Sequence, residues 1–85
     1  MENKEYTLYI LECKDNKLYT GITNDLIQRL EKHKSGKGSK FVRANLPFKL
    51  VYTENNLDRS QALKRELEIK NLTKREKIEL IMPMN

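Results

Sequence analysis

One carboxylate in the second half of the chain lies where an apolar side chain is expected. In a helix predicted over residues 58–71, Glu66 falls in the middle of a face defined by Ala62, Leu63 and Ile69. A charge there must be paired, hydrogen-bonded, protonated or bound to a metal, because burying an unpaired charge is costly. Three interpretations follow: an ion pair with Lys70 four residues on, an ion pair with Arg29 across the domain, or a divalent cation held by Glu66.

Arg29 and His33 are i,i+4 neighbours on an earlier helix, predicted from a cap at Asn24 or Asp25 to about Lys34. Its apolar stripe is expected to contain Leu26, Ile27 and Leu30, with Arg29 and His33 at the border of the stripe. A guanidinium there can lay its stem on apolar surface and reach toward a sheet edge. The alternatives are an arginine that extends into solvent and a surface histidine without a role.

Two tyrosines lie on a predicted hairpin formed by residues 6–13 and 18–23. Tyr9 and Tyr19 share a face only if the connecting loop has an odd number of residues, because side chains alternate along a strand. A three-residue loop over residues 14–16, with Asn16 left-handed, meets this condition, whereas a two-residue turn does not. Gly21 is expected to leave open space beside Tyr19, or to mark a bulge.

The elements that must position these side chains have the order β-β-α-β-α-α. This order predicts an α/β domain with a small three-stranded antiparallel or mixed sheet flanked by helices. The first strand is apolar on both faces, which is typical of a central strand. Residues 35–47 are predicted to be a loop after a helix stop at Gly36, and residues 48–53 a third strand. A capping box from Thr73 to Glu76 opens a last helix that ends before Pro83. We expect one domain over residues 1–85, with its core at about 6–81.

The net charge of +5 favours polyanionic partners. Residues 32–43, KHKSGKGSKFVR, contain lysines and an arginine but no acidic residue. This segment could be a solvated loop or a basic loop that contacts nucleic-acid phosphates.

The single Cys13 lies in an apolar segment and is interpreted as a buried thiol. The lack of a membrane-spanning run or signal peptide predicts a cytoplasmic protein.

Taken together, these residues resemble a known pattern. The segments YIL-x-C, LYTGIT-x-DL-x-x-RL-x-x-H, GKGSK and AL-x-x-E-x-x-IK are similar to those of the GIY-YIG nuclease superfamily. The likeness is strongest to its small stand-alone bacterial members, the UPF0213 group. The two motifs that name the superfamily are imperfect: they read Thr7-Leu8-Tyr9 and Tyr19-Thr20-Gly21.

This resemblance implies an endonuclease-like domain that hydrolyses nucleic-acid phosphodiester bonds, with a possible role in DNA repair or recombination. Glu66 would be the protein ligand of one Mg²⁺ or Mn²⁺ ion, and Arg29 would hold the scissile phosphate. Tyr9 or Tyr19 would position and deprotonate the attacking water. His33 would orient a tyrosine or relay a proton.

The resemblance also implies that basic residues dock nucleic acid, with DNA preferred over RNA. These residues are Lys37, Lys40, Arg43 and Lys70. A protein partner could supply specificity, and no membrane association is expected. Two other functions stay open: a nucleic-acid-binding module with the same fold and little or no activity, and an interaction protein in which Glu66 pairs with Arg29 or Lys70.

Overall fold

The computed structural model describes residues 4–84. Three strands, β1 (Tyr6–Glu12), β2 (Leu18–Thr23) and β3 (Lys49–Leu57), form one sheet with the order β2-β1-β3. Both neighbouring pairs of strands are antiparallel, which confirms the predicted sheet and the central place of the first strand. Within residues 4–84, no helix has the length and apolar character needed to cross a bilayer.

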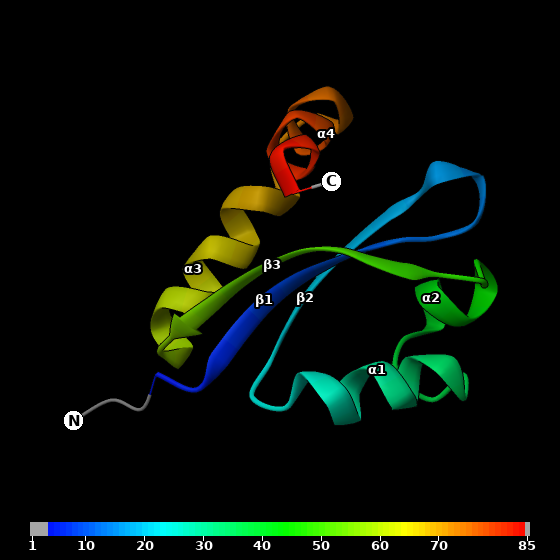
Figure 1. Ribbon diagram of the computed structural model, residues 1–85, viewed down its shortest axis with the longest axis horizontal. Coiled ribbons are helices and arrows are strands. Elements are labelled where there is room, and N and C mark those ends of the chain that lie inside the picture. Colours follow the sequence, from blue (N-terminus) through cyan, green and yellow to red (C-terminus); the bar gives the residue numbers. More distant parts are fainter. Residues whose placement is uncertain (1–3, 85) are drawn as a thin grey trace.

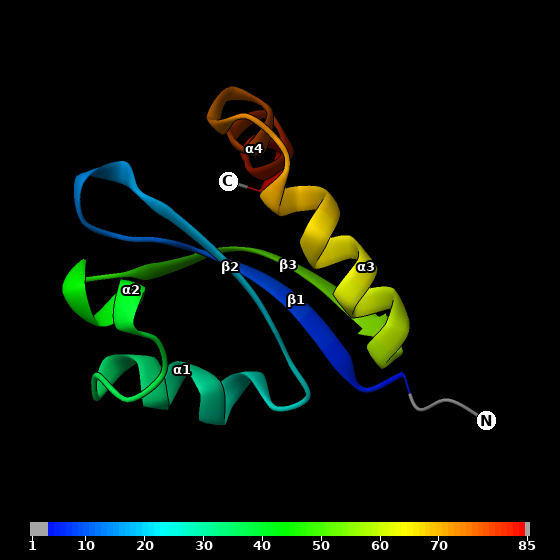
Figure 2. The same cartoon turned by 180° about the vertical axis from the view of Figure 1, so that it is seen from behind.

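The helices cover both faces of the sheet. Figures 1 and 2 show α1 (Leu26–Lys34) and α2 (Lys40–Ala44) on one side of the strands, and α3 (Arg59–Lys70) and α4 (Lys74–Ile81) on the other. Because side chains alternate along β1, the strand contributes to two cores. Leu8 and Ile10 pack with Ile69 and Ile81, while Tyr9, Leu11 and Cys13 pack with Val42. Cys13 is therefore a buried free thiol, as predicted.

Side-chain caps begin the helices where the sequence predicts. Asp25 accepts a hydrogen bond from the backbone N–H of Gln28 at the start of α1. Asp58 and Thr73 form capping boxes that open α3 and α4. Gly36 has a φ of 80° directly after α1, which is the left-handed conformation expected of a helix stop.

The β1–β2 connection has the predicted odd length. The Cys13 N–H donates to the Lys17 carbonyl over 2.7 Å and encloses a three-residue 3₁₀ turn, Lys14–Asn16. Asp15 and Asn16 both have positive φ values, 59° and 61°. This register pairs Tyr9 with Gly21 and Leu11 with Tyr19. The two tyrosines therefore lie on the same face of the sheet.

Two predicted boundaries are wrong. Residues 35–47 are not a continuous loop, because Ser39 caps α2 and Val42 is completely buried, so core packing supports a helix in a segment rich in lysine and glycine. The third strand continues past residue 53 to Leu57, since β1 still pairs with it there through a register shift near Asn56, whose φ is 63°. Sequence propensity did not indicate this extension because asparagines are poor strand formers.

Candidate active site

The Tyr9 side chain crosses from the central strand to the edge strand. A Cβ atom added at Gly21 would lie 2.6 Å from the Tyr9 hydroxyl oxygen and 2.7 Å from Cζ. The glycine is therefore required for the close approach of the ring. The open space expected beside Tyr19 is filled by Tyr9, whose hydroxyl is held above the edge of the sheet formed by β2.

His33 belongs to the core beneath this hydroxyl. It is only 1% exposed, so the prediction of a border or surface histidine is wrong. The stripe of α1 that faces the sheet consists of Leu26, Leu30 and His33, whereas Ile27 is 79% exposed. The buried face of α1 is therefore rotated from the predicted one, toward His33 on one side of the Leu26 and Leu30 stripe and away from Ile27 on the other.

The His33 side chain forms a hydrogen bond on one side of its ring only, as far as the described residues show. Its Nε2 atom lies 2.9 Å from the Tyr9 hydroxyl oxygen, and among the described residues its buried Nδ1 atom has no hydrogen-bond partner. A Cβ at Gly38 would approach Nδ1 to 2.5 Å, so the backbone of the basic segment packs on the ring. Burial and the nearby Arg29 charge lower the pKa of His33, which favours the neutral imidazole.

Arg29 and Tyr19 complete a cluster around Tyr9. The ring centroids of the two tyrosines are 6.3 Å apart, and that of Tyr19 is 5.5 Å from His33. Hydrogen bonding to the Tyr9 hydroxyl raises the pKa of Arg29. The buried Nε atom of Arg29 has no hydrogen-bond partner among residues 4–84, so this donor is unsatisfied. Arg29 thus lies at the border of the stripe, as predicted, and faces the two tyrosines.

Electrostatic effects on Tyr9 connect this cluster with α3. Burial raises the pKa of Tyr9 above its ordinary value, the Arg29 side chain opposes the rise, and the negative charge of Glu66 adds to it. Tyr9 comes from β1 and Glu66 from α3, so the charge of a residue on the α3 side of the sheet contributes to the electrostatics of the Tyr9 hydroxyl.

A second carboxylate fixes the rotation of α3. Glu54 on β3 accepts hydrogen bonds from Arg65 Nε at 2.9 and 3.0 Å, and the Tyr52 hydroxyl also donates to it. On a helix, Arg65 and Glu66 are 100° apart and flank the stripe of Ala62 and Ile69 on opposite sides. Since Arg65 is held on the β3 side, Glu66 faces the β2 side.

Glu66 is half-buried and ion-paired. Its side chain is 21% exposed, and its Oε2 atom lies 3.2 Å from Lys70 Nζ, which is the i,i+4 pair weighed from the sequence. No ion pair joins Glu66 to Arg29 among the described residues. Leu63 is 42% exposed, so it does not belong to the buried face on which it was placed. The face around Glu66 is therefore narrower and more accessible than predicted.

A divalent ion is compatible with this donor set. Residues 4–84 contain no group of three or more His, Cys, Asp and Glu side chains arranged to enclose a metal. Mg²⁺ usually keeps several waters and is bound by one or two carboxylates together with substrate phosphates. A single, partly exposed glutamate fits such a site.

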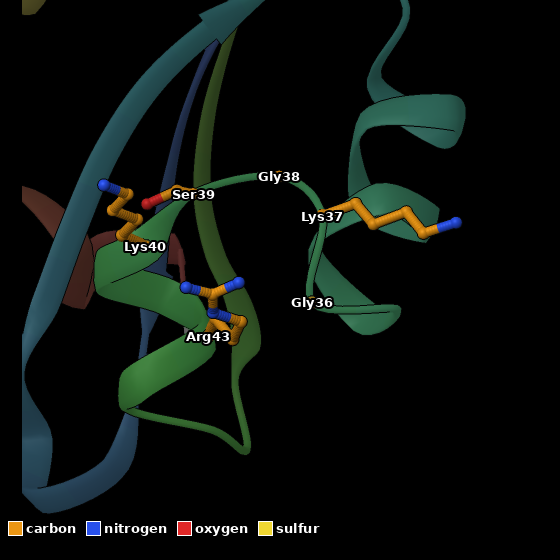
Figure 3. Close-up of a pocket in the computed structure, with 6 residues that line it drawn as sticks. All are labelled: Gly36, Lys37, Gly38, Ser39, Lys40 and Arg43. Carbon is orange, nitrogen blue, oxygen red and sulfur yellow. The ribbon is translucent and has the colours of Figure 1, made fainter.

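The basic segment forms a pocket next to this cluster. Its volume is about 350 Å³. Figure 3 shows Lys40 and Arg43 on α2 at one side of the pocket, while the Lys37 side chain extends away from both. Gly38 belongs to the same pocket and packs on His33. Lys37, Lys40 and Arg43, three of the predicted docking residues, thus all belong to this pocket. Only the side chains of Lys40 and Arg43 lie on the same side of it. Lys70 lies elsewhere, on Glu66.

The comparison with known families identifies the chain. The model of the GIY-YIG catalytic domain matches residues 5–79. The chain belongs to the GIY-YIG family. The sequence-based resemblance is therefore confirmed.

This GIY-YIG domain matches its relatives over most of their length, and the solved ones share its fold. It is 42% identical to a UPF0213 protein of Oceanobacillus iheyensis, over 93% of this chain and 92% of the relative. It is 46% identical to one of Streptococcus sanguinis, over 95% and 92%. The solution structure of the UPF0213 protein BH0048 from Bacillus halodurans matches with a TM-score of 0.60 and 44% identity, covering 91% of this chain and 82% of that chain. The protein EF2693 from E. faecalis matches with a TM-score of 0.61 and 38% identity, over 94% and 88%.

Sequence reasoning missed three members of the surroundings of the GIY-YIG site. Phe41 stacks on Tyr19, with ring centroids 6.0 Å apart and an interplanar angle of 23°. Phe48 packs edge-on against His33. Glu54 orients α3 through Arg65. An aromatic residue within a basic segment was a usable signal for Phe41, because nucleic-acid surfaces combine the two.

The contact between Tyr9 and Gly21 predicts a strong effect of one methyl group. Gly21→Ala should destabilise the domain by about 1–3 kcal/mol, because the buried Tyr9 ring has no room to retreat. Urea unfolding measures the loss. In a Tyr9→Leu background the same substitution should cost much less, and equal costs in the two backgrounds would show that the clash is not with Tyr9.

The lowered pKa of His33 predicts pH-dependent stability. Because the unfolded state takes up a proton on this residue at a higher pH than the folded state, it binds more protons between the two pKa values. This contribution to the free energy of unfolding is complete above the unfolded pKa of about 6.5 and should decline as the pH falls below it. Urea unfolding between pH 7.5 and 5.5, about one unit on either side of that pKa, measures the decline. His33→Gln should flatten the dependence; an unchanged slope would assign it to other groups.

Proposed function

We propose that this chain is a divalent-metal-dependent nuclease domain that hydrolyses phosphodiester bonds of nucleic acid. The observation that carries the proposal is the cluster at the β2 edge. In this cluster the Tyr9 hydroxyl lies 2.9 Å from His33, interacts with Arg29 and is influenced by the charge of Glu66. Membership of the GIY-YIG family supports the same reaction class.

Arg29 is proposed to hold the scissile phosphate. Its buried Nε–H lacks an acceptor among the described residues, and a phosphate oxygen would supply one. A guanidinium stays charged at every physiological pH and binds phosphate with a planar pair of donors. The contact with Tyr9 fixes the guanidinium before a substrate binds, which reduces the cost of ordering it.

The tyrosines are proposed to have different tasks. Tyr9 is completely buried, whereas Tyr19 is partly exposed, so Tyr19 is the one that can meet an attacking water. Tyr9 would act through its neighbours, since its hydroxyl can accept from Arg29 and donate to Nε2 of a neutral His33. This chain of donors and acceptors would hold Arg29 and Tyr19 in one arrangement, with Tyr9 and His33 as positioning residues.

Glu66 is proposed to hold one Mg²⁺ or Mn²⁺ ion. The bound ion would stabilise the charge that develops on the phosphate and on the leaving oxygen. The present ion pair with Lys70 does not prevent this role, because i,i+4 pairs of this exposure contribute only about 0.3–0.5 kcal/mol. Release of Lys70 would leave its ammonium group beside the bound nucleic acid, which agrees with the docking role expected from the sequence.

A nucleic-acid-binding module without activity is the second candidate. Two observations favour it: the Tyr9 hydroxyl is closed off from solvent, and Glu66 already has a cationic partner. Such a module would bind nucleic acid through its basic residues but would not respond to a divalent ion. Cleavage assays separate the two candidates.

Cleavage of branched, flapped and single-stranded substrates with Mg²⁺ or Mn²⁺ tests the proposed reaction. Glu66→Gln should reduce the rate about a hundredfold or more, because it removes the carboxylate ligand without a change of shape. Glu68→Gln is the matched control, since it removes one negative charge from an exposed position of the same helix. A folded wild type that cuts none of these substrates supports the binding module. Equal rates for wild type and Glu66→Gln remove Glu66 from the mechanism.

The same cleavage assay tests the tasks of the two tyrosines. Tyr19→Phe should slow cleavage more than Tyr9→Phe, and the opposite order would exchange the two roles.

The basic pocket predicts that the salt dependence of nucleic-acid binding depends on which basic side chains are removed, and not only on how many. Lys40→Ala/Arg43→Ala should lower the slope of log affinity against log salt by about 1.4–1.8, since each phosphate contact contributes about 0.7–0.9. Lys34→Ala/Lys37→Ala removes the same charge but should change the slope much less, because the Lys37 side chain extends away from Lys40 and Arg43 (Figure 3). Lys34 is already paired with Glu31. Equal effects of the two double variants would mean that only net charge matters.

A further inference from the structure

A second basic groove is lined in part by Phe41, which stacks on Tyr19 of the candidate site. Its lining comes from the start of β2, from α2 and from α4, and its volume is about 270 Å³. The residues that line it are Lys17, Leu18, Phe41, Lys74 and Lys77. We call it the lysine groove. It contains three cations and no carboxylate.

The cations of the lysine groove have no acidic partner among residues 4–84. Lys74 and Lys77 lie three residues apart on one face of α4, and neither is in an ion pair, whereas Arg75 between them pairs with Glu79. Lys77 is also partly buried. The ammonium of Lys17 donates to the amide oxygen of Asn45, which carries no charge. A groove of this composition is complementary to an anionic ligand.

Phe41 adds an aromatic surface to this charge and connects it with the site. The ring is 41% exposed and stacks on Tyr19 with one part of its surface. Exposed aromatic rings beside cations are the surface that holds unstacked nucleobases and their phosphates. An acidic peptide would use the lysines but would gain nothing specific from the ring.

We propose that the lysine groove binds the nucleic-acid strand that leaves the site, with one nucleobase stacked on Phe41 and backbone phosphates on Lys74 and Lys77. This inference rests on the proposed function and extends it to a separate surface. The strand would pass from Arg29 and Tyr19 over α2, whose residue 41 lies in the groove and whose residues 40 and 43 line the basic pocket. Binding would therefore continue on both sides of the reacting phosphate.

Binding without cleavage tests the groove. The full chain carrying Glu66→Gln, in a metal-free buffer, is titrated with a labelled oligothymidylate and with an abasic strand of the same length at several salt concentrations. Lys74→Ala/Lys77→Ala should lower the salt slope by about 1.4, because two phosphate contacts of a single strand are lost. Lys64→Ala/Arg75→Ala is the control of equal charge, since both residues are exposed and neither lines the groove. An equal slope change in the control variant overturns the phosphate contacts.

The abasic strand isolates the stacking. Phe41→Leu keeps an apolar side chain but removes the ring, and it should weaken binding of oligothymidylate roughly fivefold or more while leaving the abasic strand unaffected. An equal loss for both strands would overturn the stacking, because it would reflect a disturbed Tyr19 instead. Circular dichroism and urea unfolding verify that the variants fold.

Cleavage and binding together separate this inference from the proposed function. If the wild type cuts no substrate but binds through the groove, the proposed function fails and this inference stands. If it cuts but the groove variants bind like their controls, the inference fails and the proposed function stands.

Discussion

The packing of Tyr9 over Gly21 is the constraint on which the rest of the site depends. The ring can reach the β2 edge only because the paired residue has no side chain, and the pairing exists only because the hairpin loop has three residues. A shift of one residue would turn Gly21 and Tyr19 to the other face and place a β-branched side chain opposite Tyr9. His33 and Arg29 could then no longer meet its hydroxyl. A turn of positive-φ residues thus controls the geometry of side chains at the other end of the hairpin.

The opposite side of the sheet is organised by a comparable device. Ala62 and Ile69 bind α3 to the core, but a small apolar stripe leaves the helix free to rotate. The contacts of Glu54 with Arg65 and Tyr52 remove this freedom because hydrogen bonds are directional. Glu66 is consequently presented toward β2 rather than to solvent. The Glu66 carboxylate is thereby oriented by a second carboxylate, that of Glu54, through Arg65.

The sequence allowed the fold to be predicted closely, and the site only in part. Caps, the hairpin loop and strand order follow from local patterns, so Asp25, Asp58, Thr73 and Asn16 behave as expected. The burial of His33 was missed because hydrophobic periodicity assigns apolar residues to the core and ranked Ile27 above a histidine. A hydrogen bond to a tyrosine 24 positions away, which makes that burial tolerable, has no local signal. The helix at Lys40–Ala44 was missed because tertiary packing of Val42 outweighed the composition of the segment.

The same side chains build the core and the candidate site in this chain, because a short domain has few residues with which to build a core. Tyr9 and His33 are among the largest fully buried side chains, and they also form the hydrogen bond at the centre of the site. The Tyr9 hydroxyl and His33 Nε2 satisfy each other in the core. Loss of one partner is therefore expected to affect stability as well as the geometry of the candidate site. Arg29, Glu66 and Lys70 differ, since they lie at the rim and keep part of their surface exposed. Under the proposed function, the buried pair would keep the geometry of the site fixed, while the charged rim would exchange the Glu66–Lys70 ion pair for a bound cation and phosphate.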